Sequence, residues 1–162
     1  MSGQSAENLE FSIRLSGTYW GKRFPKYEIL LDDQLIYKDC IQRPPSNKGL
    51  PGCDYTSGPA NILTLEFARD LEPGEHTLCI RLVDKIQDDT RLDHAGKIDR
   101  DVLINIEDIY IDGIKLDLHQ IADSIEYRGK NLQEHWVLSM GHSGDWCLHF
   151  STPLFIWLLE RM

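Results

Sequence analysis

Basic residues are scarce in this sequence, which holds 17 Lys and Arg against 26 Asp and Glu and has a formal net charge of -9. Nucleic-acid binding needs a basic surface that neutralises phosphates. The cations here are scattered, apart from a small group at Lys22, Arg23 and Lys26. The chain also lacks an apolar run near the roughly 18 residues that cross a bilayer. We therefore expect neither nucleic-acid binding nor membrane insertion.

An apolar export signal is missing as well, because the first ten residues, MSGQSAENLE, are polar. We expect the protein to be made in a cytoplasm. The four cysteines form neither a CxxC pair nor a zinc-like spacing. Cys79 and Cys147 fall in strand-like patterns and are expected to be small buried thiols. A Cys40–Cys53 bridge across a loop is the alternative.

Catalytic motifs are equally scarce. The six histidines form no HxxxH or HExxH pattern. The segment Gly141-His142-Ser143-Gly144 is typical of a turn and lacks the strand–elbow–helix context of a G-x-S-x-G nucleophile. A glycine-rich loop that would cradle a phosphate is absent from the sequence too. We expect a protein that is not an enzyme.

Alternation of apolar and polar residues dominates what is present. It indicates strands with one buried face. The clearest examples are residues 9–15, 27–31, 63–67, 78–82 and 102–106. Since Glu72-Pro73-Gly74-Glu75 predicts a tight turn, we expect residues 63–67 and 78–82 to pair as a hairpin.

The segment from Val102 to Leu116 carries two further signals. Its apolar phase shifts by one residue across Glu107-Asp108, which predicts a β-bulge. Asp112-Gly113 then predicts a type I′ hairpin turn, because Gly readily adopts the positive φ that this turn requires.

Two segments depart from the strand pattern. Residues 39–60 hold four of the seven prolines and predict a long loop. Residues 153–161 predict a short helix, with an N-cap in Ser151-Thr152 and Pro153 at the first helical position. This helix is apolar almost all round, so it must bury its surface on its own sheet or on a partner. For the second case we assign assembly contacts to Phe155, Trp157 and Leu158.

Together these elements predict an all-β protein. About nine short strands, many turns and one small terminal helix are typical of an antiparallel β-sandwich, and we favour a jelly roll. No linker or repeat divides residues 1–162, so we expect a single domain.

Aspartates crowd one loop of this sandwich. Six of them lie between residues 84 and 101. They can be solvated, paired with cations such as Arg91, Lys97 and Arg100, or bound to calcium. The spacing does not match an EF-hand loop and by itself predicts no metal.

The surroundings of this loop resemble a known family. The motifs are Asp84, Asp99-Arg100-Asp101-Val102-Leu103, Ile109-Tyr110-Ile111-Asp112-Gly113 and an L-x-x-G-x-H-x-L hairpin at residues 71–78. They resemble calcium-dependent xylan-binding carbohydrate-binding modules, which are small jelly rolls. That family usually carries Asn at the position of Asp101. The resemblance implies calcium as a cofactor, Asp84, Asp99 and Asp101 as its ligands, and a glycan held partly by the metal.

The end of the chain has a resemblance of its own. Residues 144–160 resemble the ends of β-sandwich proteins from tailed phages. This resemblance implies a virion component, assembled in the host cytoplasm, with other virion proteins or further copies of itself as partners.

Aromatic residues on loops are the remaining candidates. Tyr19, Trp20 and Phe24 lie in one polar loop, and Tyr55 lies in the proline-rich loop. Such rings can stack on a sugar or anchor a protein partner, and they can also close the ends of a sandwich.

Our leading hypothesis is a non-catalytic binding or structural module of a phage tail, fibre or capsid decoration. The alternatives are a calcium-dependent carbohydrate-binding protein and a small hydrolase of unrecognised type.

Overall fold

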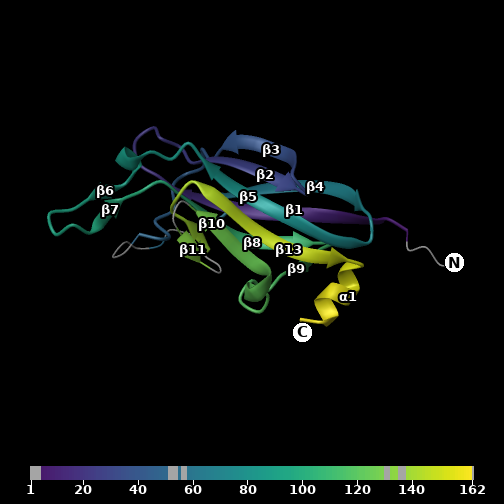
Figure 1. The fold of residues 1–162 in the computed structure, drawn as a ribbon. Coiled ribbons are helices and arrows are strands. Elements are labelled where there is room, and N and C mark those ends of the chain that lie inside the picture. Colours follow the sequence, from purple (N-terminus) through teal and green to yellow (C-terminus); the bar gives the residue numbers. More distant parts are fainter. Residues whose placement is uncertain (1–4, 51–54, 56–57, 130–131, 135–137, 162) are drawn as a thin grey trace.

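Two antiparallel sheets pack face to face in the computed structural model, which describes residues 5–50, 55, 58–129, 132–134 (backbone alone) and 138–161 (Figure 1). The first, here the β1 sheet, has the order β12 (Ser139–Met140), β8 (Leu103–Ile111), β1 (Glu7–Thr18) and β4 (Ile62–Leu71), and β9 (Ile114–Lys115) pairs with β8. The second, the β13 sheet, has the order β11 (Leu132–Glu134), β10 (Ile125–Gly129), β13 (Gly144–Thr152), β5 (Gly74–Val83), β2 (Lys26–Leu31) and β3 (Gln34–Cys40).

Smaller elements lie outside the two sheets. Strands β6 (Arg91–Leu92) and β7 (Ile98–Arg100) form a two-stranded arm that follows the 3-10 turn η1 (Gln87–Asp89). A second 3-10 turn, η2 (Ala122–Ser124), precedes β10, and the chain closes with helix α1 (Leu154–Leu159). The arm and α1 lie at opposite ends of the molecule (Figure 1).

The core lies between the sheets because each strand turns its apolar side chains inward. On β1 the side chains of Leu9, Ile13 and Leu15 have no exposed surface. Phe11 of the same strand contacts Phe150 of β13, with ring centroids 6.0 Å apart. Burying a side chain of this size contributes roughly 1.5–3 kcal/mol, so this alternation accounts for the sandwich.

The connections give the jelly-roll character. Along the chain, β1, β4, β8 with β9, and β12 belong to one sheet, and the strands between them, apart from the β6–β7 arm, belong to the other. The chain therefore crosses the core repeatedly. The predicted fold class, an antiparallel β-sandwich with a short C-terminal helix, is confirmed.

The predicted hairpin of residues 63–67 and 78–82 is wrong. Strand β4 pairs with β1, whereas β5 pairs with β13 and β2. The turn at Glu72-Pro73 instead carries the chain from one sheet to the other. Alternation states which face of a strand is buried, and two strands that face each other across the core satisfy it as well as two that pair.

Both signals in the segment after the arm are confirmed. Arg14 pairs with Asp108 and Leu15 with Ile106, which leaves Glu107 as the extra residue of a β-bulge. Asp112 and Gly113 have φ values of 52° and 74° and join β8 to β9. Positive φ at both central residues is the signature of a type I′ turn.

The helix begins differently from the prediction. Ser151 and Thr152 extend β13, and Pro153 itself is the N-cap residue. The Thr152 hydroxyl donates to the carbonyl of Glu72 at 2.7 Å, so it does not cap α1. The first helical amide, that of Leu154, is satisfied by the Glu7 carboxylate at 3.0 Å. Within the described segments no helix has the length and apolar character that a membrane span requires.

Candidate binding surfaces

The aspartate loop folds into the β6–β7 arm and its base, and Asp89 is central to that base. Its side chain is 2% exposed. Arg23 donates to both carboxylate oxygens, each at 2.8 Å, and the backbone amide of Ile86 donates at 2.9 Å. The hydrogen bonds from Arg23 hold the pKa of Asp89 below its ordinary value, and the Ile86 amide adds to this effect. Asp89 is therefore a structural carboxylate.

Asp101 forms the second buried pair of the arm. Its carboxylate lies 2.7 Å from the Lys85 ammonium, and the two side chains are 7% and 8% exposed. Asp101 also accepts hydrogen bonds from the Thr90 hydroxyl and the Val102 amide, both at 2.8 Å. Lys85 in turn donates to the carbonyl of Gly141. The pair joins the arm to the segment that follows β12.

Asp84 and Asp99 have cationic partners too. Asp84 lies 3.5 Å from Lys26, and Asp99 pairs with Arg91. The structure thus gives Asp84, Asp99 and Asp101 three different cations. Among the described residues, no three His, Cys, Asp or Glu side chains gather as a metal site would require. The donor set does not fit a calcium ion, because each of the three carboxylates is paired with an ammonium or guanidinium group. Calcium binding stays a prediction.

The four loop aromatics do not form one stacking platform. Tyr19 and Phe24 contact each other, with ring centroids 5.0 Å apart. Trp20 donates its indole N–H to the carbonyl of Asp89 at 2.8 Å, beneath the Arg91 guanidinium. Trp20 therefore supports the base of the arm, whereas Tyr19 donates its hydroxyl to the carbonyl of Arg43 in the proline-rich loop.

Tyr55 belongs to another cluster, centred on Glu107, a residue that the sequence analysis did not single out for binding. The Glu107 carboxylate accepts hydrogen bonds from the Ser16 hydroxyl at 2.6 Å, from Lys48 at 3.1 Å and from the Tyr55 hydroxyl at 3.1 Å. Because Glu107 is the bulged residue, its side chain reaches partners from β1 and from the proline-rich loop. The only signal in the sequence was the phase shift itself.

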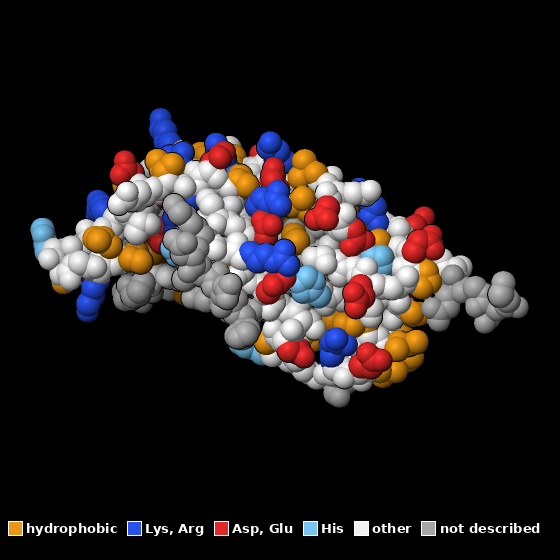
Figure 2. Space-filling view, viewed as in Figure 1, with side chains coloured by type: hydrophobic (Ala, Val, Ile, Leu, Met, Phe, Trp, Pro, Cys, Tyr) orange, Lys and Arg blue, Asp and Glu red, His pale blue; other side chains and the backbone are white. Residues whose placement is uncertain are grey.

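Helix α1 presents an apolar face. Phe155 and Leu159 are 69% and 52% exposed, and hydrophobic side chains gather where α1 lies (Figure 2). Trp157, also assigned to assembly, is 3% exposed and packs edge-on against Phe150, with centroids 6.3 Å apart. Leu158 packs against the core from a partly buried position. Of the three predicted assembly residues, only Phe155 offers most of its side chain to solvent.

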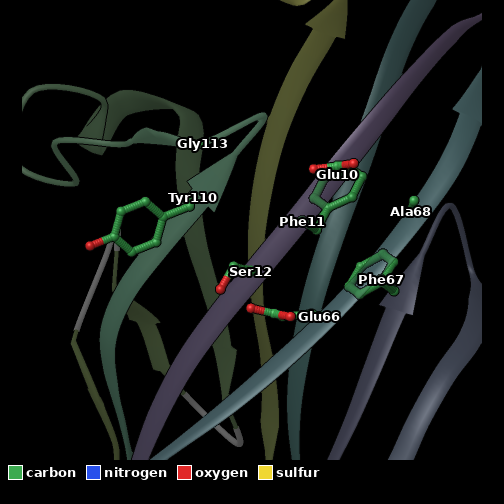
Figure 3. Close-up of a pocket in the computed structure, with 8 residues that line it drawn as sticks. All are labelled: Glu10, Phe11, Ser12, Glu66, Phe67, Ala68, Tyr110 and Gly113. Atoms are coloured by element: carbon green, nitrogen blue, oxygen red, sulfur yellow. The ribbon is translucent and has the colours of Figure 1, made fainter.

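The outer face of the β1 sheet carries a hollow of about 580 Å³. Ser12 pairs with Tyr110 on one side and with Glu66 on the other, so these three side chains form one row across β8, β1 and β4 (Figure 3). Glu10 and Ala68 form the next row. The hollow exists because Ser12 and Ala68 are small, whereas the residues beside them are large.

Two carboxylates border this hollow. Glu10 and Glu66 are exposed and lie on the diagonal of the β1–β4 ladder, a relation that puts residues roughly 7–8 Å apart. Within the described part of the chain, no cation or hydrogen-bond donor pairs with either side chain. Together with Tyr110 and Ser12 they offer an aromatic ring, a hydroxyl and two free acceptors on one open surface.

The outer face of the β13 sheet is covered by ion pairs instead. Arg81 pairs with Asp145 at 2.6 Å and with Glu28 at 3.2 Å, and basic and acidic groups alternate across this face (Figure 2). Glu126 contacts His149 at 2.8 Å and pairs with Arg128. Arg128 first, and His149 second, hold the pKa of Glu126 below its ordinary value.

Thr77 extends the His149 pair into a chain of hydroxyl, imidazole and carboxylate. The Thr77 hydroxyl lies 3.1 Å from Nδ1 of His149, whose Nε2 faces Glu126. A nucleophile also needs donors for an oxyanion. The Thr77 amide is already donated to the Asp32 carboxylate at 2.8 Å, and Arg128 competes for Glu126. This row of three side chains therefore links β5, β13 and β10 across the outer face of the sheet.

Comparisons with known proteins give a similar solved structure and no match in sequence. No family model matches the chain, and no curated protein matches its sequence. A solved structure, "vCBM60 in complex with galactobiose", is similar with a TM-score of 0.39 and 8% identity, over 88% of this chain and 97% of that one. At this level of similarity, the galactobiose in that structure carries no weight for a ligand of this chain.

Proposed function

We propose that the protein is a non-catalytic binding module that holds a neutral saccharide chain in the hollow of the β1 sheet. The observation that carries this proposal is the row of Tyr110, Ser12 and Glu66, together with Glu10 in the next row, whose carboxylate has no partner among the described residues. These groups lie abreast on a regular sheet, so the backbone holds them in place before any ligand binds.

The chemistry of the row suits a sugar. A pyranose presents a C–H face and a rim of hydroxyl groups. The ring of Tyr110 offers an apolar surface for the first, and carboxylates form strong charge-assisted hydrogen bonds with the second. Glu10 and Glu66 would repel an anionic sugar, as would the net charge of -9. The proposed ligand class is therefore neutral.

Hydrolysis is the alternative use of two carboxylates across a groove. Their diagonal relation gives a separation of roughly 7–8 Å, and inverting glycosidases place their carboxylates about 6.5–9.5 Å apart. The acid of such a pair is kept protonated by an apolar surrounding. Glu10 and Glu66 are both exposed, so the geometry favours binding.

The test is a titration with a panel of short neutral oligosaccharides, followed by calorimetry or by amide NMR shifts. Tyr110→Ala should lose at least tenfold in affinity, and Glu10→Gln with Glu66→Gln should weaken binding further. Thr64→Ala, on the same face of β4 beyond the hollow, is the matched control and should bind as the wild type does. Unchanged binding by Tyr110→Ala would refute the proposal.

The same titration separates this hollow from the predicted calcium route. If binding needs calcium and is lost in Asp99→Ala but kept in Tyr110→Ala, the sugar lies at the arm. Binding that is indifferent to chelator supports the β1 sheet.

A second candidate function is assembly through α1. The observation that favours it is the exposure of Phe155 and Leu159 on one face of the helix, next to the exposed Ile114 of β9. Contiguous apolar surface of this kind marks protein contacts, and we propose a further copy of this chain as the partner. Analytical sedimentation of the wild type should show self-association. The double substitution Phe155→Ser with Leu159→Ser should remove it, and the control Glu160→Ser should keep it. A wild type that stays monomeric at high concentration would refute this second function.

The phage virion setting stays a prediction. Mass spectrometry of purified particles would test it.

A further inference from the structure

Two cysteines face each other on the polar side of the β13 sheet. Cys79 of β5 and Cys147 of β13 are register partners, and their sulfur atoms are 2.8 Å apart. Neither is part of a disulfide. Free cysteine is normally a small buried hydrophobe. These two side chains instead point away from the core, because their neighbours along the two strands, Leu78, Ile80 and Leu148, point into it.

The surroundings of the pair are charged. A hollow of about 290 Å³ opens over the two sulfurs, and Arg81, Arg128 and His149 are among the residues that line it. Cys79 is half-buried, whereas Cys147 is 1% exposed. Cys79 is thus within reach of a small reagent, and the more deeply buried Cys147 lies beside it on the neighbouring strand.

We propose that Cys79 and Cys147 form a reversible disulfide, oxidised by a small-molecule disulfide of the glutathione class that reacts first at Cys79. Strand geometry supports closure of the bond. Register partners in antiparallel strands have Cα atoms about 4.5–5.5 Å apart, inside the range of about 4.4–6.8 Å that disulfides use.

The two thiols differ in the way that this order of attack requires. The hydrogen bond from Cys147 lowers the pKa of Cys79, and Arg128 and Arg81 act in the same direction. The hydrogen bond to Cys79, together with burial, raises the pKa of Cys147. Cys79, the more accessible of the two thiols, is therefore the one that more readily becomes a thiolate.

The reaction balances as two thiol–disulfide exchanges. The Cys79 thiolate attacks one sulfur of the reagent, whose sulfur–sulfur bond breaks, and the first thiolate leaves and takes up a proton. The Cys147 sulfur then attacks Sγ of Cys79, and the second thiolate leaves with the Cys147 proton. The protein loses two electrons and two protons, and one small-molecule disulfide becomes two thiols.

Closure of this bond would join the two central strands of the β13 sheet. It would link β13, which leads directly into α1, to β5 through a covalent bond. Because the bond restricts the unfolded chain between residues 79 and 147, the melting temperature should rise by roughly 5–10 °C.

The test equilibrates the folded protein with a series of reduced and oxidised glutathione. A Cys40→Ser, Cys53→Ser background leaves the pair as the only thiols; Cys53 lies outside the described residues. We expect this variant to lose two hydrogens by intact mass, to resist iodoacetamide and to melt at a higher temperature, all reversed by excess reduced glutathione. A glutathione adduct that never closes, or a wild-type bridge that maps to Cys40 or Cys53, overturns the proposal.

Two single substitutions in that background test the order of attack. Cys147→Ala should stop at a stable glutathione adduct on Cys79. Cys79→Ser should form almost no adduct, because Cys147 is buried. If Cys147 reacts as fast in Cys79→Ser as Cys79 does in Cys147→Ala, the assignment of the attacking thiol is wrong.

Discussion

The arm and the hollow of the β1 sheet are both acidic, and they differ in what their carboxylates contact. In the arm, Asp89 and Asp101 are buried against Arg23 and Lys85. In the hollow, Glu10 and Glu66 border open space (Figure 3). The buried aspartates of the arm thus hold the fold together through ion pairs, whereas two glutamates that are isolated in the sequence are the better candidates for binding a ligand. A carboxylate that is not paired with a cation of its own protein is the better candidate for contact with a ligand.

The largest expected effect on stability in either acidic region is that of Asp101→Ala. The substitution leaves the Lys85 ammonium buried without its counter-ion, and we expect a loss of about 3–5 kcal/mol in the free energy of unfolding. Urea denaturation measures it. Asp88→Ala, an exposed aspartate of the same loop, is the control and should stay within about 0.5 kcal/mol of the wild type.

A double variant shows whether the charge pair itself matters. Lys85→Met with Asp101→Leu removes both charges together, so it should be less destabilised than Asp101→Ala alone. If Asp101→Ala unfolds at the urea concentration of the wild type, the buried pair is not a structural element.

Asp89→Asn tests the second buried pair through pH. Arg23 holds the pKa of Asp89 below its ordinary value, so the unfolded chain binds this proton more readily than the folded one does. The stabilisation is present above about pH 4, near the ordinary Asp pKa, and is lost as the pH falls through the lower folded value.

We expect Asp89→Asn to lose about 1–3 kcal/mol at pH 7, the cost of weakening a hydrogen-bonded charge pair. Its unfolding free energy should also fall less steeply than that of the wild type below pH 4. Thermal melts from pH 2 to pH 8 measure both, and parallel profiles for the two proteins would contradict this account.

In the hollow the expected effect on stability is small. Glu10→Gln with Glu66→Gln removes two exposed charges that have no cation beside them among the described residues, so the free energy of unfolding should stay within about 0.5 kcal/mol of the wild type. The same variant should lose saccharide affinity. Stability and binding thus respond in opposite ways in the two acidic regions. A large destabilisation here would mean that these glutamates are structural.

The smallest expected effect concerns calcium. The Arg91 guanidinium holds the pKa of Asp99 below its ordinary value at an exposed site. A calcium ion would have to displace this cation, and the cations beside Asp84 and Asp101. We expect millimolar calcium to leave the melting temperatures of wild type and Asp99→Ala unchanged. A rise in the wild type alone would restore the metal site that the family resemblance implies, by linkage of binding to folding.

Local signals predicted local features well. The phase shift at Glu107-Asp108 predicted the bulge, and Asp112-Gly113 predicted the turn, because each is decided by a few adjacent residues. The helix was predicted within a few residues, although its cap was not, since the Thr152 hydroxyl found a carbonyl distant in sequence. The candidate hollow could not be predicted, because Ser12, Glu66 and Tyr110 come from three separate strands.

The sequence by itself determined which side chains each strand buries, where the chain turns and that the result is a β-sandwich, because a period of two is written within each strand. Only the tertiary structure decided partners. It placed β4 and β5 in different sheets, and it set Cys79 opposite Cys147. It also paired the buried aspartates of the arm with their cations, such as Asp101 with Lys85. The reason is physical: the choice among strands depends on loop closure and on packing across the core, and neither is encoded in the pattern of any one strand.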